Sequence, residues 1–293
     1  MLDDAVKKSE TLIEALPYIK GFQRKFIVIK LGGSAQDDPD VLRRLFIDID
    51  FLLAVGIRPV VVYGGGKRIT QAMAELGKPA QFLHGQRVTD AETMEVVSRV
   101  LIDGVGRDLL SLLAACGGRG ALLSGRDQGF LRAIKKRLPT QPEVDLGYVG
   151  DPVAIDAAAV YDILEEGKIP LIAPVACGCG TEANQLYNIN GDTAAALIAR
   201  DLHAEKIVFL MDVAGVYRDR CDPSSLISRL SRLEAESMIR SGAADGGMIP
   251  KLEACLFALA GGVRKAHIVP GAQPHALLLE IFTAKGVGTE IVL

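Results

Sequence analysis

The sequence predicts an α/β fold with an open, mainly parallel central sheet and helices on both faces. Two observations lead to this prediction. Short runs rich in Val, Ile and Leu fit strands that are buried on both faces, as in a parallel sheet. Helix-length segments with apolar residues three and four positions apart lie between these runs. This alternation of strand and helix favours helices packed on the two faces of one sheet.

The expected elements follow one another along the chain. Apolar runs typical of buried strands occupy residues 26–31, 58–63, 120–123, 169–175, 206–211 and 266–269. Helical spacing of apolar residues occupies residues 40–55, 193–202 and 251–260. Residues 130–149 break the pattern, because they are polar and contain two prolines but keep some strand character. We expect them to form a β-hairpin that projects from the sheet.

The chain of 293 residues suits two lobes, since one domain commonly holds roughly 100–200 residues. We place the boundary between the lobes in the glycine-rich stretch 176–181. The expected units are therefore an N-terminal extension helix (1–20), an N-lobe (21–178) and a C-lobe (179–293).

The extension has an apolar stripe on one face of its expected helix. The stripe consists of Leu2, Val6, Leu12, Ile13, Leu16 and Ile19. The helix is expected to end near Pro17, because proline is disfavoured inside a helix. It could pack on its own domain or be exchanged between subunits, and the spacing by itself favours packing on its own domain.

Composition argues against several classes of protein. A formal net charge of −3 offers no basic footprint for nucleic acid. No stretch approaches the roughly 18–20 apolar residues that cross a bilayer, and the N-terminus lacks the apolar core of a secretory signal. We therefore expect a cytoplasmic protein with no membrane partner. The five cysteines and four histidines show no metal-ligand spacing, which favours reduced thiols and no metal site in the protein.

Three glycine-rich turns lie at the ends of expected elements. They contain Gly32 and Gly33, Gly65 and Gly66, and Gly247. Glycines let backbone N–H groups approach an anion, and a helix N-terminus adds unpaired donors. Ligands of open α/β sheets bind where such loops follow the strands. Neither GxxxxGK[ST] nor GxGxxG occurs, and one such turn alone is usually only a turn, but three of them favour a phosphate site.

Three basic residues are candidates for binding anions. Lys30 interrupts a strongly apolar strand, where a lysine is costly unless it is paired or bound to an anion. The alternative is that Lys30 reaches solvent at the strand end, and that Lys251 is an ordinary surface lysine. The planar guanidinium of Arg87 suits a carboxylate. Its alternative is a surface ion pair with Asp90.

A polar cluster precedes the expected helix at 193–202. It reads NINGDT, from Asn188 to Thr193. Helix capping explains Asp192 or Thr193 well, since both residue types favour the N-cap. Capping explains the two asparagines less well.

Taken in this order, the motifs identify a family. They are KLGGS at 30–34, YGGGKRI at 63–69, GQRVTD at 85–90, LLSGRD at 122–127, VDLGYVGDP at 144–152, YNINGDTAA at 187–195, LMDVAGVY at 210–217, GGMIPK at 246–251 and LLEIFTAKGVGT at 278–289. The chain resembles the N-acetylglutamate kinases of the amino acid kinase superfamily over nearly its whole length. The resemblance implies the αβα sandwich of that superfamily.

The resemblance also implies an activity: transfer of a phosphoryl group from ATP, with Mg²⁺, to N-acetyl-L-glutamate in the second step of arginine biosynthesis. The N-lobe would bind the acylated amino acid and form a dimer, and the C-lobe would bind ATP. Lys30 and Lys251 would stabilise the transferring group, and Asp192 would orient both lysines. Substrate contacts would come from Gly65, Gly66, Arg87 and Asn188. Nucleotide contacts would come from Gly32, Gly33, Asp212, Gly215, Val216 and Gly247.

The extension resembles the N-terminal helix of arginine-inhibited, hexameric members of the family, in which it interlaces dimers. This likeness implies a trimer of dimers and L-arginine as an inhibitor. Tyr18, Glu280 and Gly286 are the implied arginine contacts.

The chain departs from its relatives at two places. Tyr63 replaces the His that most relatives carry before the triple glycine, and Pro270 and Gln273 replace polar or basic residues. Two alternatives stay open: a kinase of another N-modified amino acid, and a non-catalytic sensor of arginine or nucleotide. The intact set of Lys30, Asp192 and Lys251 favours catalysis.

Overall fold

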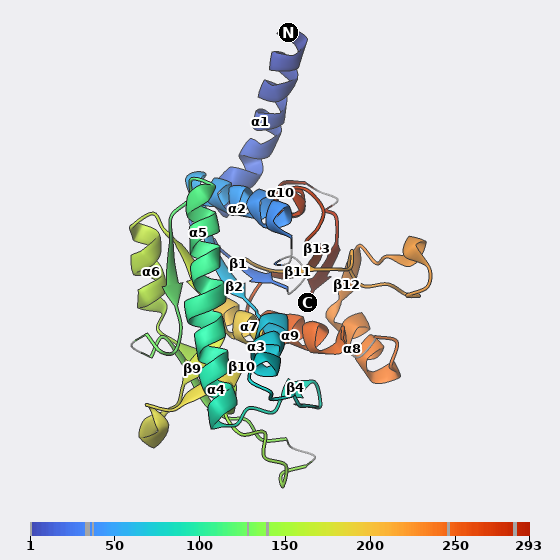
Figure 1. The fold of residues 1–293 in the computed structure, drawn as a ribbon. Helices are drawn as coiled ribbons and strands as arrows, with labels where there is room; N and C mark the ends of the chain where they lie inside the picture. The colour runs from blue at the N-terminus through green and yellow to red at the C-terminus, as the bar shows by residue number, and fades with distance from the viewer. Residues whose placement is uncertain are drawn as a thin grey trace.

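The computed structural model describes residues 2–32, 36, 38–127, 129–138, 141–244, 247–283 and 286–293. At its centre is an eight-stranded sheet in the order β12-β14-β13-β11-β1-β2-β8-β5 (Figure 1). Its strands are β1 (Phe26–Leu31), β2 (Arg58–Tyr63), β5 (Gly120–Leu123), β8 (Ile169–Ile172), β11 (Lys206–Met211), β12 (Arg229–Ser231), β13 (Lys265–Pro270) and β14 (Thr289–Val292). Every neighbouring pair is parallel except β13 and β14. The predicted open, mainly parallel sheet is confirmed.

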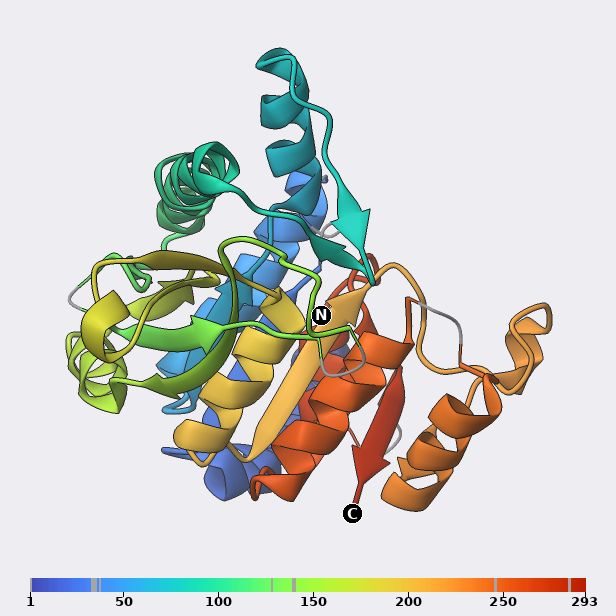
Figure 2. The ribbon, with the colours of Figure 1, turned by 90° about the horizontal axis from the view of Figure 1, so that it is seen from below.

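Helices cover both faces of the sheet, as predicted. Successive strand residues point to opposite faces, so Ile27 and Ile29 belong to one apolar core and Val28 to the other. The core that contains Val28 is covered by α6 (Ala157–Glu165), α7 (Gly191–Asp201), α8 (Arg232–Ser241) and α9 (Ile249–Ala260). The opposite core is covered by α2 (Pro39–Ala54), α3 (Gly66–Glu75), α4 (Ala91–Ser98), the π-helical segment η2 (Arg99–Gly106), α5 (Arg107–Ala115) and α10 (Ala276–Phe282). Figure 2 shows α7 and α9 side by side on their face.

A small barrel lies beside the central sheet. It consists of β6 (Leu131–Lys135), β7 (Val149–Ile155), β9 (Val175–Cys177) and β10 (Leu186–Ile189). The hairpin predicted within 130–149 is confirmed only in its first strand: β6 pairs antiparallel with β7, but β7 begins where the predicted segment ends, and both strands belong to the barrel. The single strand predicted at 169–175 is wrong. It is broken at Pro174, which has no N–H to donate to a ladder, and β9 joins the barrel.

The N-terminal helix α1 (Leu2–Phe22) projects from the body (Figure 1). Two predictions about it are wrong, because it continues past Pro17 and because Val6, Leu12, Ile13 and Leu16 of its stripe are exposed rather than packed on its own domain. The exposed fractions of Leu12 and Ile13 are 66% and 67%. Its last turns contact the body, where Tyr18 meets the ring of Phe282 edge-on, with the ring centres 6.5 Å apart. These contacts support the helix beyond the proline.

Among the described residues, no helix is long and apolar enough to cross a membrane.

A short antiparallel hairpin is formed by β3 (Phe82–Leu83) and β4 (Gln86–Arg87). The predicted division at residue 178 falls between β9 and β10 of the barrel and stays a prediction.

Candidate active site

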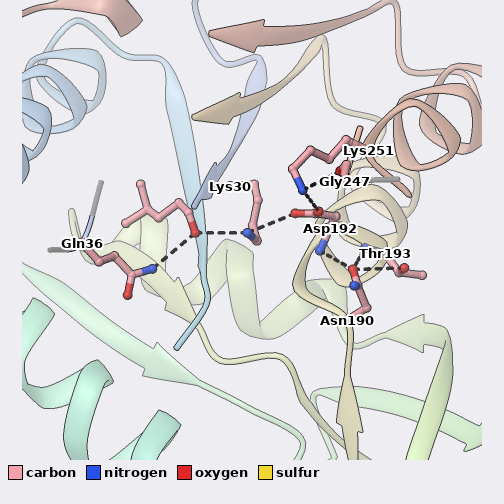
Figure 3. A network of polar contacts seen from close by, with 8 residues as sticks. Lys30, Gln36, Asn190, Asp192, Thr193, Gly247 and Lys251 are labelled. Carbon is pink, nitrogen blue, oxygen red and sulfur yellow. Dashed lines mark hydrogen bonds and ion pairs between the residues drawn. The ribbon is translucent and has the colours of Figure 1, made fainter. Parts of the chain in front are cut away.

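Three charged side chains from different elements meet at the carboxyl end of β1. The ammonium of Lys30 lies 3.1 Å from Oδ1 of Asp192, and that of Lys251 lies 3.2 Å from Oδ2 of the same carboxylate (Figure 3). Asp192 belongs to the first turn of α7, and Lys251 to the first turn of α9. Lys30 is only 8% exposed. Both alternatives, a solvent-reaching Lys30 and an ordinary surface Lys251, are therefore wrong.

The cap of α7 explains why Asp192 is available to the lysines. Asn190 is the N-cap, and its side-chain oxygen accepts hydrogen bonds from the backbone N–H groups of Asp192 and Thr193 at 2.9 and 3.1 Å. The expectation that Asp192 or Thr193 serves as the cap is therefore wrong. Gly191 is required for another reason: a Cβ there would lie 2.7 Å from Cε of Lys30.

The cluster carries an ionised carboxylate. Burial by itself would raise the pKa of Asp192, but the charges of Lys30 and Lys251 outweigh it and leave the pKa below its usual value. Two ammonium groups and one carboxylate give a net positive charge, which attracts an anionic ligand.

Two adjacent cavities open beside the cluster. The first, of about 320 Å³, is lined by the three charged residues together with Gly32 and Gly247. The second, of about 350 Å³, is lined by residues 212–217 and by apolar side chains of α8 and the following loop. The residues that line both cavities are Asp212, Val213, Arg220 and Met248. A cationic cavity beside a partly apolar one fits the phosphates and the base of a nucleotide.

The predicted nucleotide residues take different places around these cavities. The backbone N–H of Gly32 donates to the carbonyl of Leu210 at 3.1 Å, so it is not a free donor for phosphate, contrary to the expectation. Gly33 lies outside the described residues. Gly215 allows close packing, because a Cβ there would lie 2.4 Å from the hydroxyl of Thr289, and that hydroxyl accepts the N–H of Val216 at 2.8 Å.

The turn before α3 lies next to the cluster. A Cβ at Gly64 would lie 3.9 Å from the ammonium of Lys30. Gly65 is the N-cap of α3 and Gly66 its first residue, so backbone N–H groups of this turn lack intrahelical partners. The carbonyl of Gly66 accepts a hydrogen bond from Arg87 at 2.9 Å.

Arg87 is buried rather than exposed on the surface. Its Nη2 also donates to the hydroxyl of Thr70 at 2.8 Å, and its guanidinium lies 4.7 Å from the ring centre of Phe82. Burial lowers the pKa of Arg87. Asp90 pairs with Lys78 at 2.6 Å instead, so the surface pair of Arg87 and Asp90 is wrong.

Thr89 connects Arg87 to Asn188. Its hydroxyl donates to the carbonyl of Arg87 at 2.7 Å and accepts from Nδ2 of Asn188 at 3.2 Å. The structure thus brings together two of the four residues predicted to contact substrate.

The predicted arginine contacts fall on neighbouring elements. The carboxylate of Glu280 in α10 accepts Nδ1 of His267 at 2.7 Å and the backbone N–H of Val287 at 2.7 Å. Gly286 has φ +60°, and a Cβ there would lie 2.6 Å from Glu280 Oε2. Tyr18 lies on α1, which contacts α10.

Sequence reasoning missed three residues that line the cavities or contact the predicted residues: Thr89, Arg220 and His267. Thr89 stands inside the motif GQRVTD, which could have indicated it. Arg220 follows DVAGVY in a loop with no motif of its own. His267 lies in an apolar strand, as Lys30 does, and the same anomaly could have indicated it. Among the described residues, no group of three or more His, Cys, Asp or Glu could hold a metal ion.

Comparison with known proteins agrees with this geometry. The model of the amino acid kinase family matches residues 25–270. An acetylglutamate kinase of Pelotomaculum thermopropionicum is 46% identical over 97% of this chain and 98% of its own length. One of Symbiobacterium thermophilum is 45% identical over all of both chains.

Solved structures share the architecture. An N-acetylglutamate synthase of Neisseria gonorrhoeae, complexed with coenzyme A and N-acetyl-glutamate, superposes with a TM-score of 0.82 at 28% identity. The match covers 97% of this chain, which spans 63% of the synthase chain. An isopentenyl phosphate kinase superposes with a TM-score of 0.62 at 18% identity over 91% of this chain and all of its own, and shares the fold.

Proposed function

The chain belongs to the amino acid kinase family, and from that premise we propose that it transfers the γ-phosphoryl group of ATP to the side-chain carboxylate of N-acetyl-L-glutamate. The product is N-acetyl-L-glutamyl 5-phosphate, and the reaction is the second step of arginine biosynthesis. The observation that carries the proposal is the Lys30–Asp192–Lys251 cluster beside a two-part cavity, in a chain that matches acetylglutamate kinases from end to end.

The chemistry asks the protein to bring two anions together. A side-chain carboxylate has a pKa of roughly 4, so near neutral pH it is already a nucleophile and needs no general base. The barrier lies in aligning the carboxylate with the γ-phosphorus and offsetting their repulsion. Preorganised cations perform that task, since they stabilise charge that develops on the transferring group. Lys30 and Lys251 have this role in our account, and Asp192 pairs with both ammonium groups, offsets their mutual repulsion and keeps them oriented.

The C-lobe, 179–293, binds ATP in this proposal. The phosphates occupy the cavity beside the lysines, near Gly32 and Gly247, and the adenosine lies along Asp212, Gly215 and Val216. The residues present fit a magnesium–nucleotide complex, because Mg²⁺ commonly binds through substrate phosphates, water and one or two carboxylates, and Asp212 borders both cavities. Mg²⁺ would neutralise phosphate charge there.

The N-lobe, 21–178, holds most of the acid site in this proposal and forms the dimer. Arg87 and Asn188, joined through Thr89, bind the α-carboxylate and its neighbouring groups. Gly65 and Gly66 offer backbone N–H groups to oxygens of the acid. We place the enzyme in the cytoplasm, where ATP is available.

Arg87→Lys is expected to raise KM for N-acetylglutamate by roughly 10–100-fold, the loss of one or two hydrogen bonds to a charged group. Lysine keeps the charge but loses the planar fork that Gly66, Thr70 and a carboxylate can share. KM for ATP should stay within about twofold. Arg58→Lys is the matched control. Arg58 also lies against aromatic rings, but it is the first residue of β2, at the end opposite the glycine turn. Equal KM values for wild type and Arg87→Lys would remove Arg87 from the acid site.

The proposal is tested by ADP release from ATP-Mg with each of four acids: N-acetylglutamate, N-acetylaspartate, glutamate and aspartate. Turnover that requires N-acetylglutamate supports it. Preference for another N-modified acid would identify a different kinase. If the folded protein binds ATP and turns over none of the four acids, it is a sensor rather than a kinase.

We also propose that α1 assembles a trimer of dimers that L-arginine inhibits. Its exposed stripe of Val6, Leu12, Ile13 and Leu16 fits the same helix of another subunit. The N. gonorrhoeae synthase has been crystallised with L-arginine, at a TM-score of 0.80 and 28% identity. Here arginine would bind near Tyr18, Glu280 and Gly286, where α1 meets α10.

Deletion of residues 1–20 should leave dimers that keep kcat but lose inhibition by arginine. The double variant Leu12→Glu/Ile13→Glu should do the same, because two buried charges would disfavour the helix pair. Glu14→Gln, on the same helix, is the control. Light scattering reports the mass, and the activity assay reports inhibition. A deletion variant that loses catalysis together with inhibition would count against this role of α1.

A further inference from the structure

Tyr63 lies next to the glycine turn but faces away from the lysine cluster. It belongs to the same core as Ile29, whereas Val62, which is in register with Lys30, belongs to the opposite core. The side chain of Tyr63 is fully buried, and its hydroxyl donates to the backbone carbonyl of Leu101 at 3.1 Å. Tyr63 is therefore placed to act on the site through Leu101.

The acceptor belongs to an unusual segment. Leu101 lies in η2, where the helix that begins as α4 takes π-helical form before it continues as α5. π-Helical turns are rare and are frequent at functional sites. Gly106 leaves room for the contact: a Cβ there would lie 2.5 Å from the hydroxyl of Tyr63 and 3.1 Å from the carbonyl of Leu101. The glycine, the carbonyl and the phenol fit one another closely.

The same segment supports the turn that holds substrate in our account. A Cβ at Gly65 would lie 2.6 Å from Cδ2 of Leu101 and 3.4 Å from Cγ2 of Val105, so η2 packs directly on the turn. The next residue, Gly66, accepts the hydrogen bond of Arg87. A continuous path of contacts thus runs from the Tyr63 hydroxyl through Leu101 and the turn to Arg87.

We propose that Tyr63 is a positioning residue, whose hydrogen bond to Leu101 holds η2 against the Gly64–Gly66 turn and so orients that turn and Arg87 toward the acid. The inference rests on the proposed function and adds a residue for the acid side of the site. The nucleotide side is built from α7, α9 and the loop after β11, and does not depend on this bond. Burial raises the pKa of Tyr63, which keeps its hydroxyl a donor.

Tyr63→Phe removes only the hydroxyl. We expect KM for N-acetylglutamate to rise roughly three- to tenfold, the change that corresponds to one hydrogen bond, with kcat and KM for ATP within about twofold of wild type. Tyr161→Phe is the control, since Tyr161 packs on Phe26 in a different layer. The assays are run well below the unfolding temperature of each variant, so that a change in KM reflects the positioning of the acid site and not a loss of folded protein.

Gly106→Ala provides the second test, because its methyl group would displace the Tyr63 hydroxyl. It should raise KM for N-acetylglutamate in the same selective way. The double variant with Tyr63→Phe should show a KM no higher than Gly106→Ala alone, since the hydroxyl, which the new methyl group would meet at the shortest distance, is gone. If the two substitutions instead raise KM for N-acetylglutamate independently, so that their free-energy changes add, the inference is overturned.

The inference and the proposed function fail separately. A wild-type protein without activity on N-acetylglutamate defeats the proposed function. An active wild type whose Tyr63→Phe variant keeps its KM for N-acetylglutamate, or raises the KM of both substrates equally, defeats only the positioning role.

Discussion

Asp192→Asn is expected to lower kcat by about 10²–10³-fold, the usual effect of disturbing a preorganised charge in a phosphoryl- or acyl-transfer site. Asparagine has the same shape but no negative charge, so the ammonium groups at 3.1 and 3.2 Å lose the anion between them. They then repel each other and leave the positions that we assign to binding the phosphoryl group. Steady-state kinetics with saturating ATP-Mg measures the loss.

The same substitution should destabilise the fold. Removing one partner of a buried ion pair typically costs about 3–5 kcal/mol in free energy of unfolding. Asp145→Asn makes the same chemical change in an exposed pair with Lys135, at 2.9 Å and with the aspartate side chain 68% exposed. That pair should contribute at most about 1 kcal/mol. Urea denaturation compares the two variants, and equal losses of stability would contradict the buried role of Asp192.

Lys30→Met is a further test of the same cluster. It should lower kcat by about 10²–10³-fold, with little change in the Kd of ATP. Methionine fills the space of the lysine stem and removes the ammonium, so binding determinants distant from the γ-phosphate are kept. Lys206→Met is the matched control, because Lys206 is a buried strand lysine whose ammonium lies 5.1 Å from the ring centre of Phe22. A Lys30→Met enzyme within tenfold of wild type would remove Lys30 from the reacting centre.

Much of the fold could be predicted because its strands leave few alternatives. The runs at 26–31, 58–63 and 206–211 match β1, β2 and β11 to the residue. Their consecutive apolar residues suit only an element buried on both faces. Lys30 could be singled out because it lies inside its run, whereas Arg58 and Lys206 stand at the first positions of theirs.

Other features depended on contacts that the sequence does not show. Pro17 was expected to end α1, yet packing of Tyr18 against Phe282 supports another turn. Arg87 was given Asp90 as an alternative partner, but Lys78, distant in the sequence, occupies that carboxylate. Which partner a side chain takes is decided by the residues that the tertiary fold brings close to it, and the local sequence pattern does not show these.

The cap of α7 and the π-helical η2 were beyond sequence reasoning for a different reason. Asn190, Asp192 and Thr193 are all good caps, and only the backbone geometry assigns the cap to Asn190. A π-helix bonds residue i to residue i+5, one residue further along than an α-helix. The spacing of apolar residues does not distinguish the two kinds of helix over so short a segment. Both features matter to the site, since one presents Asp192 and the other supports the glycine turn.

The most direct test of the account is to trap the product with hydroxylamine. Wild-type enzyme incubated with ATP-Mg and N-acetylglutamate should yield the γ-hydroxamate of N-acetylglutamate in amounts equal to the ADP released, and Lys30→Met should yield almost none. Equal amounts of hydroxamate and ADP would show that the phosphoryl group goes to the side-chain carboxylate. ADP without hydroxamate, or hydroxamate from free glutamate instead, would contradict the account.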